Sequence, residues 1–453
     1  MGIKNYLTNI IETFPKIIND KSPNNIDIVC VDVNTILHRI CSKSQNNEQF
    51  KKHITKEFDK IIKIMKPKTI ALFTDGQAVL AKAKTQIKRR QKYLYDTSKG
   101  ISTLNLTPGT IFMDTVDDII INYLKKLDID TFYSSSKENN EGEIKLFQYI
   151  VSLNDFNKRV CVVGDDSDII VLALFNTPIL NLYIYNNYKF LSLFTLVRKL
   201  SDLSENKFNL SHHPIRKDFA LLSLFLGNDY NKNISHFKNI FSAYKKVLNK
   251  KTGFLIEKNG NLNLKNIKKL FKNISHNNND KLYSKNNVNA YFNSIIWNIK
   301  LYSGNVIPNY IPEYNINIKT ILNYFPDNIK IDEIVPQWQD KNVYLLLLMP
   351  IVGKLLIPKN IQHLMNKDSP IKDLFPEPCP RCIEFKKNIK ELLSEVDTYD
   401  ETKYKLLSSE LNNEYKKHLD NNHKIDTLPI DRIKSVFILY FLKIYYYFIY
   451  YYI

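Results

Sequence analysis

Carboxylates gather at the ends of apolar runs in the N-terminal part of the sequence. The stretch VVGDDSDIIVLAL places Asp165, Asp166 and Asp168 directly after an apolar run. Asp32 lies within IDIVCVDV and Asp75 ends TIALFTD, two further runs rich in β-branched and apolar residues. A single aspartate in such a place usually caps the following helix. Several carboxylates brought together repel one another, and a bound divalent cation removes that repulsion.

Further acids stand at other predicted element boundaries. EGEIK supplies Glu141 and Glu143 at the start of a predicted helix, and LFLGNDY adds Asp229 after an apolar helix. Carboxylate oxygens suit Mg²⁺ or Mn²⁺, and two such ions are typical of phosphodiester hydrolysis. The acids that we predict as metal ligands and as catalytic residues are Asp32, Asp75, Glu141, Glu143, Asp166, Asp168 and Asp229.

Basic residues recur at helical spacing in TDGQAVLAKAKTQIKRR. Lys82, Gln86 and Arg89 follow one another at intervals of four and three, which places them on one face of a helix, with Arg90 beside them. A guanidinium fork and an ammonium group both bond phosphate oxygens. The pattern predicts a site for a terminal phosphate; the alternative is a solvated basic stripe.

These residues need a scaffold, and the sequence predicts one from alternating strands and helices. Helical spacing covers residues 50–64, 116–127 and 143–152, between runs that read as strands. Alternation of this kind predicts an α/β fold, a mostly parallel central sheet flanked by helices. Sites in such sheets lie beyond the carboxyl ends of the strands, where the acids are. The predicted strands are residues 26–33, 69–75, 130–136, 159–165 and 179–185.

Charge and cysteine content limit the class of partner and the compartment. The sequence of 453 residues has a formal net charge of +18, which favours nucleic acid or an anionic membrane surface as a partner. Abundant Asn, Lys, Ile and Tyr are also typical of an AT-rich coding sequence, so part of the lysine excess has no functional meaning. The five cysteines do not suggest a disulfide framework. We therefore expect a reducing compartment, the cytoplasm, with the nucleus as the alternative.

The C-terminal part contains a cysteine and histidine pattern and an unusual tail. CPRC places Cys379 and Cys382 at the spacing of a zinc half-site, and HLDNNH adds His418 and His423. The pattern predicts a structural zinc site, with two ordinary thiols as the alternative. The last stretch, VFILYFLKIYYYFIYYYI, is long enough to cross a bilayer but is rich in tyrosine, which prefers interfaces. We favour a buried terminal element or an irregular end over a membrane anchor.

Several motifs in fixed order resemble the Xrn-type 5′→3′ exoribonucleases. The resemblance begins with MGIKNYLTNIIETFPKI and VDVNTILH and continues through the basic helix, TPGTIFM, EGEIK, GDDSDIIVLAL and GNDY. It extends over residues 241–271 and 345–377, and so covers about the first 377 residues. Short viral members of the family are closest in size.

The resemblance implies a fold, an activity and roles for further residues. It implies a PIN/FEN-like nuclease core with a largely helical C-terminal extension, acting as a metal-dependent 5′→3′ exoribonuclease in RNA degradation such as mRNA decay. The substrate would be single-stranded RNA with a 5′-monophosphate, held by the basic helix and released as mononucleotides. His38 would stack on a base, and Lys145 would stabilise charge on the phosphate. We expect a monomer that acts beside the decapping machinery.

The same comparison suggests a division of the chain and shows departures from the family pattern. We expect a nuclease domain, a helical continuation, a zinc module and an apolar tail, at residues 1–235, 236–377, 378–430 and 431–453. Ile144 stands where the family has a histidine, and Asp165 stands where it has an apolar residue, so we expect Asp165 to be solvated or outside the ligand set. Two alternatives remain open: a FEN-like structure-specific DNA nuclease and a non-catalytic RNA-binding scaffold.

Overall fold

The computed structural model divides into two compact units, each built from two segments of chain. It describes residues 2–3, 5–91, 101–176, 179–204, 209–248, 253–257, 259–329, 333–394, 409–418 and 427–438. The first unit comprises residues 1–82 and 115–338, and the second comprises residues 83–114 and 339–453. The expected boundary at residue 235 does not separate compact units, because the helices that follow it share the hydrophobic core of the sheet-bearing unit.

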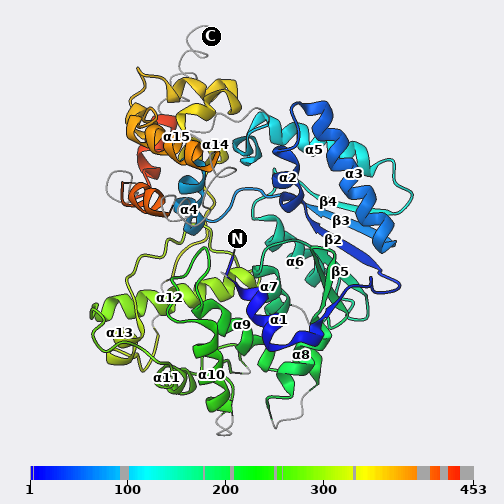
Figure 1. Cartoon of the computed structure of the whole chain (residues 1–453), viewed down its shortest axis with the longest axis vertical. Coiled ribbons are helices and arrows are strands. Elements are labelled where there is room, and N and C mark those ends of the chain that lie inside the picture. Colours follow the sequence, from blue (N-terminus) through cyan, green and yellow to red (C-terminus); the bar gives the residue numbers. More distant parts are fainter. Residues whose placement is uncertain are drawn as a thin grey trace, which may run out of the picture. The chain divides into compact units, whose positions relative to one another are not determined.

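A mostly parallel sheet forms the centre of the first unit, which confirms the predicted α/β class (Figure 1). Within the described residues it has seven strands in the order β1-β7-β6-β5-β2-β3-β4. The four pairings from β6 to β4 are parallel, and β7 pairs antiparallel with both β1 and β6. The strands are β1 (Ile18–Asn19), β2 (Ile28–Asp32), β3 (Thr69–Phe73), β4 (Asp130–Ser134), β5 (Val160–Val163), β6 (Leu182–Asn186) and β7 (Lys189–Ser192).

The five predicted strands are β2 to β6, and the structure adds the two short strands at one edge. β7 follows β6 through a two-residue turn in which Asn187 and Tyr188 have φ of 47° and 64°. Such a turn suits a hairpin, but it usually contains glycine, so the sequence carried no clear signal for it. Every residue of β2 is buried, as expected for a parallel strand covered on both faces.

Helices surround this sheet and extend the core of the first unit. α6 packs on β2 and β3, whereas α7 and α8 pack on β6, and α9 packs against α7 in turn. The helices of this unit are α1 (Tyr6–Thr13), α2 (Val33–Cys41), α3 (Asn47–Met65), α6 (Gly142–Ser152), α7 (Asp168–Asn176), α8 (Leu193–Ser201), α9 (Ile215–Phe225), α10 (Phe237–Leu248), α11 (Leu264–Lys272), α12 (Lys285–Tyr302) and α13 (Ile318–Asn323). Two helices cross the division of the chain: α4 (Leu80–Gln91) and α5 (Ile111–Leu124).

The second unit is helical in its described part, in agreement with the expected helical C-terminal extension. Gly109, at a φ of 92°, lets the backbone approach the Leu345 side chain of α14. Its elements include α14 (Lys341–Leu348), α15 (Pro380–Ser394) and the 3₁₀ helices η3 (Thr103–Leu106), η5 (Ile351–Leu356), η6 (Lys359–Met365) and η7 (Lys372–Leu374). Residues 409–418 and 430–438 are also helical.

The apolar tail lies mostly outside the described residues, which end at residue 438. Among the residues that the structure does describe, no helix combines the length and the hydropathy that a membrane crossing requires.

A buried carboxylate ties helix α9 to the segment after α10. Asp218 is fully buried and accepts hydrogen bonds from the Leu255 and Ile256 amides and the Tyr244 hydroxyl, at 2.8 to 3.0 Å. Asp218→Ala would leave three buried donors without an acceptor, so we expect a loss of about 3 kcal/mol and a melting midpoint lower by about 3 to 5 °C. Thermal unfolding followed by circular dichroism measures this. The exposed Asp20→Ala is the control; equal midpoints for both variants would contradict the assignment.

Candidate active site

A cavity of about 230 Å³ in the first unit collects most of the predicted acids. It opens beyond the carboxyl ends of β2, β3 and β5, where the strand order predicts a site. Its lining comes from segments that are far apart in the sequence. The residues that line it are Asp32, Asn34, Thr35, His38, Asp75, Lys82, Glu141, Glu143, Asp165 and Asp166.

Asp32 both caps a helix and faces this cavity. It ends β2, and its two carboxylate oxygens accept hydrogen bonds from the Asn34 amide at 3.2 Å and the Thr35 hydroxyl at 2.9 Å. The Asn34 side-chain oxygen in turn accepts a hydrogen bond from the Asp75 amide at 2.9 Å. Capping therefore accounts for part of the position of Asp32, and the same contacts hold the second acid beside it.

Gly142 allows two carboxylates to approach the backbone at the start of α6. Its amide donates to Asp75 Oδ1 at 2.6 Å. A Cβ atom at this position would lie 3.1 Å from Asp32 Oδ1 and 3.3 Å from Asp75 Oδ1. A side chain here would crowd both aspartates and the Phe73 carbonyl, so glycine suits this position.

Lys82 is buried among acids at the beginning of α4. Its ammonium forms an ion pair with Glu141 and a second one with Asp229 Oδ2 at 3.1 Å. The Tyr230 hydroxyl donates to the other oxygen of Glu141 at 2.5 Å. Burial by itself lowers the pKa of Lys82, but the carboxylates of Glu141, Asp229 and Glu143 outweigh it and raise that pKa. Lys82 therefore acts here as a counter-charge to the acids.

The turn before α7 holds Asp166 and Asp168. Asp166 Oδ1 accepts the Asp168 amide at 3.2 Å, and Asp168 Oδ2 accepts the Tyr302 hydroxyl at 2.8 Å. Gly2, with a φ of 76°, packs directly on this turn: a side chain there would collide with Asp166 and lie 2.8 Å from Asp168 Oδ1. The N-terminal segment therefore closes one side of the acidic cluster.

The electrostatics of the cluster reflect crowding of like charge away from water. Burial, together with Asp75 and Asp166, raises the pKa of Asp32 to about 8. Burial and the neighbouring Asp166 raise the pKa of Asp168 to about 7. The pKa of Glu143 lies well above its ordinary value for the same reasons, burial first and then the two aspartates of the α7 turn. A divalent cation would favour the charged forms of all three.

The remaining residues predicted for substrate binding lie in different surroundings. His38 lines the cavity from α2. The ammonium of Lys145 donates to the Ser135 carbonyl at 2.7 Å, and burial lowers its pKa to about 8. Asp165 is exposed at the rim, in accord with its expected solvation.

Three basic-helix residues belong to the second unit, although they share α4 with Lys82. Gln86 accepts the Tyr344 hydroxyl at 2.9 Å, and Arg90 donates from Nε to the Thr107 hydroxyl at 2.8 Å. Arg89 stands in the last turn of the helix. The helix that the spacing predicted is present, while the role of this face stays a prediction.

Sequence reasoning missed three residues that support the acids. The sequence could have indicated Tyr230, because it directly follows the predicted ligand Asp229 in GNDY. Tyr302 and the close packing of Gly2 carried no local signal, since their partners lie far away in the sequence. Ile144, the departure within EGEIK, is buried in the core.

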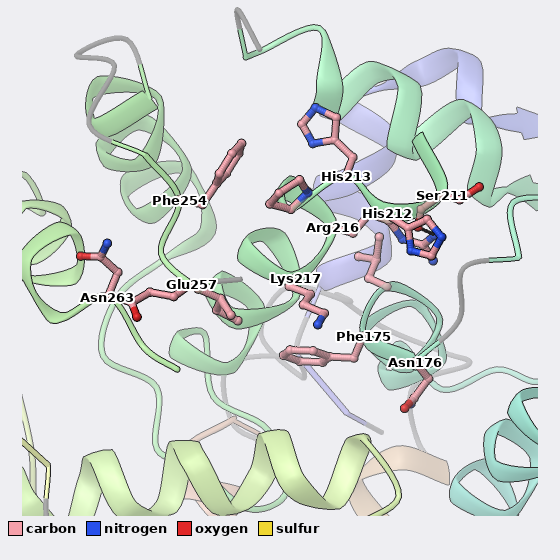
Figure 2. A pocket seen from close by; sticks show the side chains of 13 residues that line it. Phe175, Asn176, Ser211, His212, His213, Arg216, Lys217, Phe254, Glu257 and Asn263 are labelled. Atoms are coloured by element: carbon pink, nitrogen blue, oxygen red, sulfur yellow. Dashed lines mark hydrogen bonds between the residues drawn. The ribbon is translucent and has the colours of Figure 1, made fainter. Parts of the chain in front are cut away.

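A larger cavity of about 490 Å³ in the same unit is lined by none of the predicted metal ligands or substrate-binding residues (Figure 2). Phe175, Phe254 and Lys217 line it together with the buried Arg216. The guanidinium of Arg216 donates hydrogen bonds to the Ser211 and Ala173 carbonyls, both at 2.9 Å. These bonds connect two backbone segments. We assign no chemistry to this cavity.

The structure describes three of the four predicted zinc ligands. The ligand atoms of Cys379, Cys382 and His418 lie within 4.8 Å of one another in the second unit. His423, the fourth predicted ligand, lies outside the described residues.

Comparison with known proteins agrees with the motif order. Residues 1–102 and 92–185 match the family model described as XRN 5′-3′ exonuclease N-terminus. The chain is 26% identical over 340 residues to 5′-3′ exoribonuclease 1 of Saccharomyces cerevisiae, an alignment that covers 59% of this chain and spans 22% of the length of the yeast protein.

Solved structures with a similar arrangement include two nucleases bound to DNA. The catalytic core of Rad2 with a DNA substrate is 14% identical, with a TM-score of 0.34, over 71% of this chain and 92% of that one. The flap endonuclease D15 of bacteriophage T5, with DNA and metal ions, is 14% identical, with a TM-score of 0.32, over 62% and 89%. The N-terminal region of the chain, residues 1–185, is thus similar to the N-terminus of the XRN 5′-3′ exonucleases.

Proposed function

We propose that this chain is a divalent-metal-dependent 5′→3′ exoribonuclease that degrades 5′-monophosphorylated RNA to mononucleotides. The observation that carries the proposal is the convergence on one cavity of buried and partly buried carboxylates from the ends of three strands and the start of α6. The name of the yeast relative supports RNA as the substrate class. The net charge of +18 favours a polyanion of this kind.

The residues at the cavity fit a pair of hard divalent ions. The acids that would hold them are the seven predicted from the sequence. Five of them line the cavity, the Asp168 amide donates to Asp166, and Asp229 pairs with Lys82. Burial and like charge raise the pKa of Asp32, Glu141, Glu143 and Asp168. Asp168 Oδ1 is a buried oxygen with no hydrogen-bond partner among the described residues, so a cation would satisfy it. Mg²⁺ or Mn²⁺, when bound, would supply an activated water and charge stabilisation at the scissile phosphate.

The protein's own side chains would position the RNA. His38, on the cavity wall, would stack on a base near the cut, a contact that tolerates any sequence. Gln86, Arg89 and Arg90 would bind the terminal 5′-monophosphate through charged and amide hydrogen bonds. Lys145, on α6, would stabilise negative charge on the phosphate. Lys82 would keep Glu141 and Asp229 in place.

The direct test compares four labelled oligonucleotides of one sequence: single-stranded RNA and DNA, each with a 5′-monophosphate or a 5′-hydroxyl. We expect mononucleotides from the phosphorylated RNA in Mg²⁺ and no reaction in EDTA. Asp166→Asn should lower the rate by a factor of about 10³ or more, because a ligand to the metal is lost, while RNA binding persists. The exposed Asp202→Asn is the matched control.

Other outcomes of this assay would contradict the proposal. Preferred cleavage of branched DNA would indicate a structure-specific DNA nuclease. Binding of RNA without cleavage in either metal would indicate a scaffold. Unchanged hydrolysis by Asp166→Asn would remove the acids from the active site.

The phosphate-binding role of α4 has a separate test. Arg89→Ala should reduce the ratio of rates on 5′-monophosphate and 5′-hydroxyl RNA by about tenfold, since a charged hydrogen bond contributes about 1.5 kcal/mol or more. Lys88→Ala, the neighbour on another face of the helix, should keep the ratio. Steady-state rates on both substrates give the answer; an equal ratio in Arg89→Ala and the parent would refute the assignment.

Stability should depend on pH and metal together. The raised pKa values of Asp32 and Asp168 mean that the folded state binds more protons than the unfolded state between pH 4 and 8, so stability without metal should fall as pH rises through that range. Mg²⁺ should therefore raise the melting midpoint more at pH 8 than at pH 6. Thermal scans with Mg²⁺ or EDTA measure this. In Asp32→Asn the metal-dependent shift should shrink; a shift of the parent's size there would count against the site.

A further inference from the structure

We infer that the second unit binds one structural zinc ion through Cys379, Cys382 and His418. This inference is independent of the nuclease proposal, because it concerns residues of another unit and needs no RNA. The sequence motif alone left two ordinary thiols as an alternative. The structure places the predicted His418, from the separate helical segment 409–418, beside the two thiols.

The distances between the ligand atoms match those around tetrahedral zinc. With Zn–S near 2.3 Å and Zn–N near 2.05 Å, a tetrahedral angle separates sulfur from nitrogen by about 3.6 Å and sulfur from sulfur by about 3.8 Å. Cys379 Sγ lies 3.6 Å from His418 Nε2. All three ligand atoms lie within 4.8 Å of one another. One ion placed among them can therefore reach each ligand with small adjustments.

The position of the two thiols on α15 also favours a metal. Cys379 directly precedes the helix, Pro380 is its first residue, and Cys382 follows within the first turn. Pro380 suits this place because it needs no amide donor there. The arrangement presents both sulfurs from one rigid turn.

The surroundings resemble a closed structural site more than a catalytic one. Cys382 is fully buried, and Cys379 and His418 are partly buried. The Phe385 ring lies 6.0 Å from the His418 ring and 5.8 Å from the Tyr415 ring, centroid to centroid. This aromatic cover limits access of water to the ligands. The ion would fasten the start of α15 to the end of the helical segment 409–418.

The number of ligands is consistent with a structural role. Structural zinc takes four ligands, and three are present in the described residues. The sequence predicts His423 as the fourth. Soft thiolates beside imidazole select zinc over the hard ions expected at the carboxylate cavity, so the two sites would take different metals.

The test uses the full chain, expressed with zinc in the medium and purified without chelators. Elemental analysis should find about one zinc per chain, and a thiol-modifying mercurial should release it, as followed with a chromogenic chelator. Replacement of zinc by cobalt should produce a thiolate-to-cobalt charge-transfer band, which reports sulfur ligation directly.

Variants separate metal ligation from packing. Cys382→Ser and His418→Ala should lose zinc, whereas His418→Cys should retain it, because a thiolate can replace the imidazole as ligand. Cys41→Ala, which removes a buried thiol in the first unit, should keep the full zinc content. If a variant does not fold, the cobalt spectrum of the parent chain still decides the question.

Three results would overturn the inference. These are a parent chain without zinc or a cobalt band, an unchanged zinc content in both Cys382→Ser and His418→Ala, and a disulfide between the two cysteines in place of metal. Nuclease activity does not enter these measurements, so failure here and failure of the exoribonuclease proposal can be told apart.

Discussion

Mutual repulsion between buried carboxylates is the constraint on which the active-site region depends. Asp32, Asp168 and Glu143 each have a raised pKa because burial and acidic neighbours disfavour their charge. A chain keeps such a cluster only where something offsets the repulsion. Lys82 supplies one buried positive charge. The buried Oδ1 of Asp168 has no hydrogen-bond partner among the described residues, so the negative charge of the cluster is only partly compensated.

The backbone is adapted to the same constraint. Gly142 and Gly2 each stand where a Cβ atom would lie close to carboxylate oxygens of the cluster, so both positions favour glycine. Hydroxyl groups of Thr35, Tyr230 and Tyr302 fix individual oxygens by hydrogen bonds. The acids are therefore held in defined positions, which is what a metal site requires of its ligands.

The order of the strands explains why these acids can meet at all. β2 lies between β5 and β3, and all three are parallel, so their carboxyl ends open at one edge of the sheet. α6 returns along β2 and β3 and brings its own glutamates to that edge. Between β3 and β4 the chain runs out through α4 and returns through α5, and the intervening residues 83–114 belong with the C-terminal segment to the second unit.

The sequence by itself determined the α/β class, the five central strands and the acids at their ends, because hydrophobic periodicity and turn residues act between near neighbours. It could not specify the edge hairpin, whose turn lacks glycine, or the division into two units. Only the tertiary structure decided that Lys82 pairs with Glu141 and Asp229, and that Tyr302 reaches Asp168 across 134 residues. Such contacts depend on how distant elements pack, and no local pattern in the chain encodes that packing.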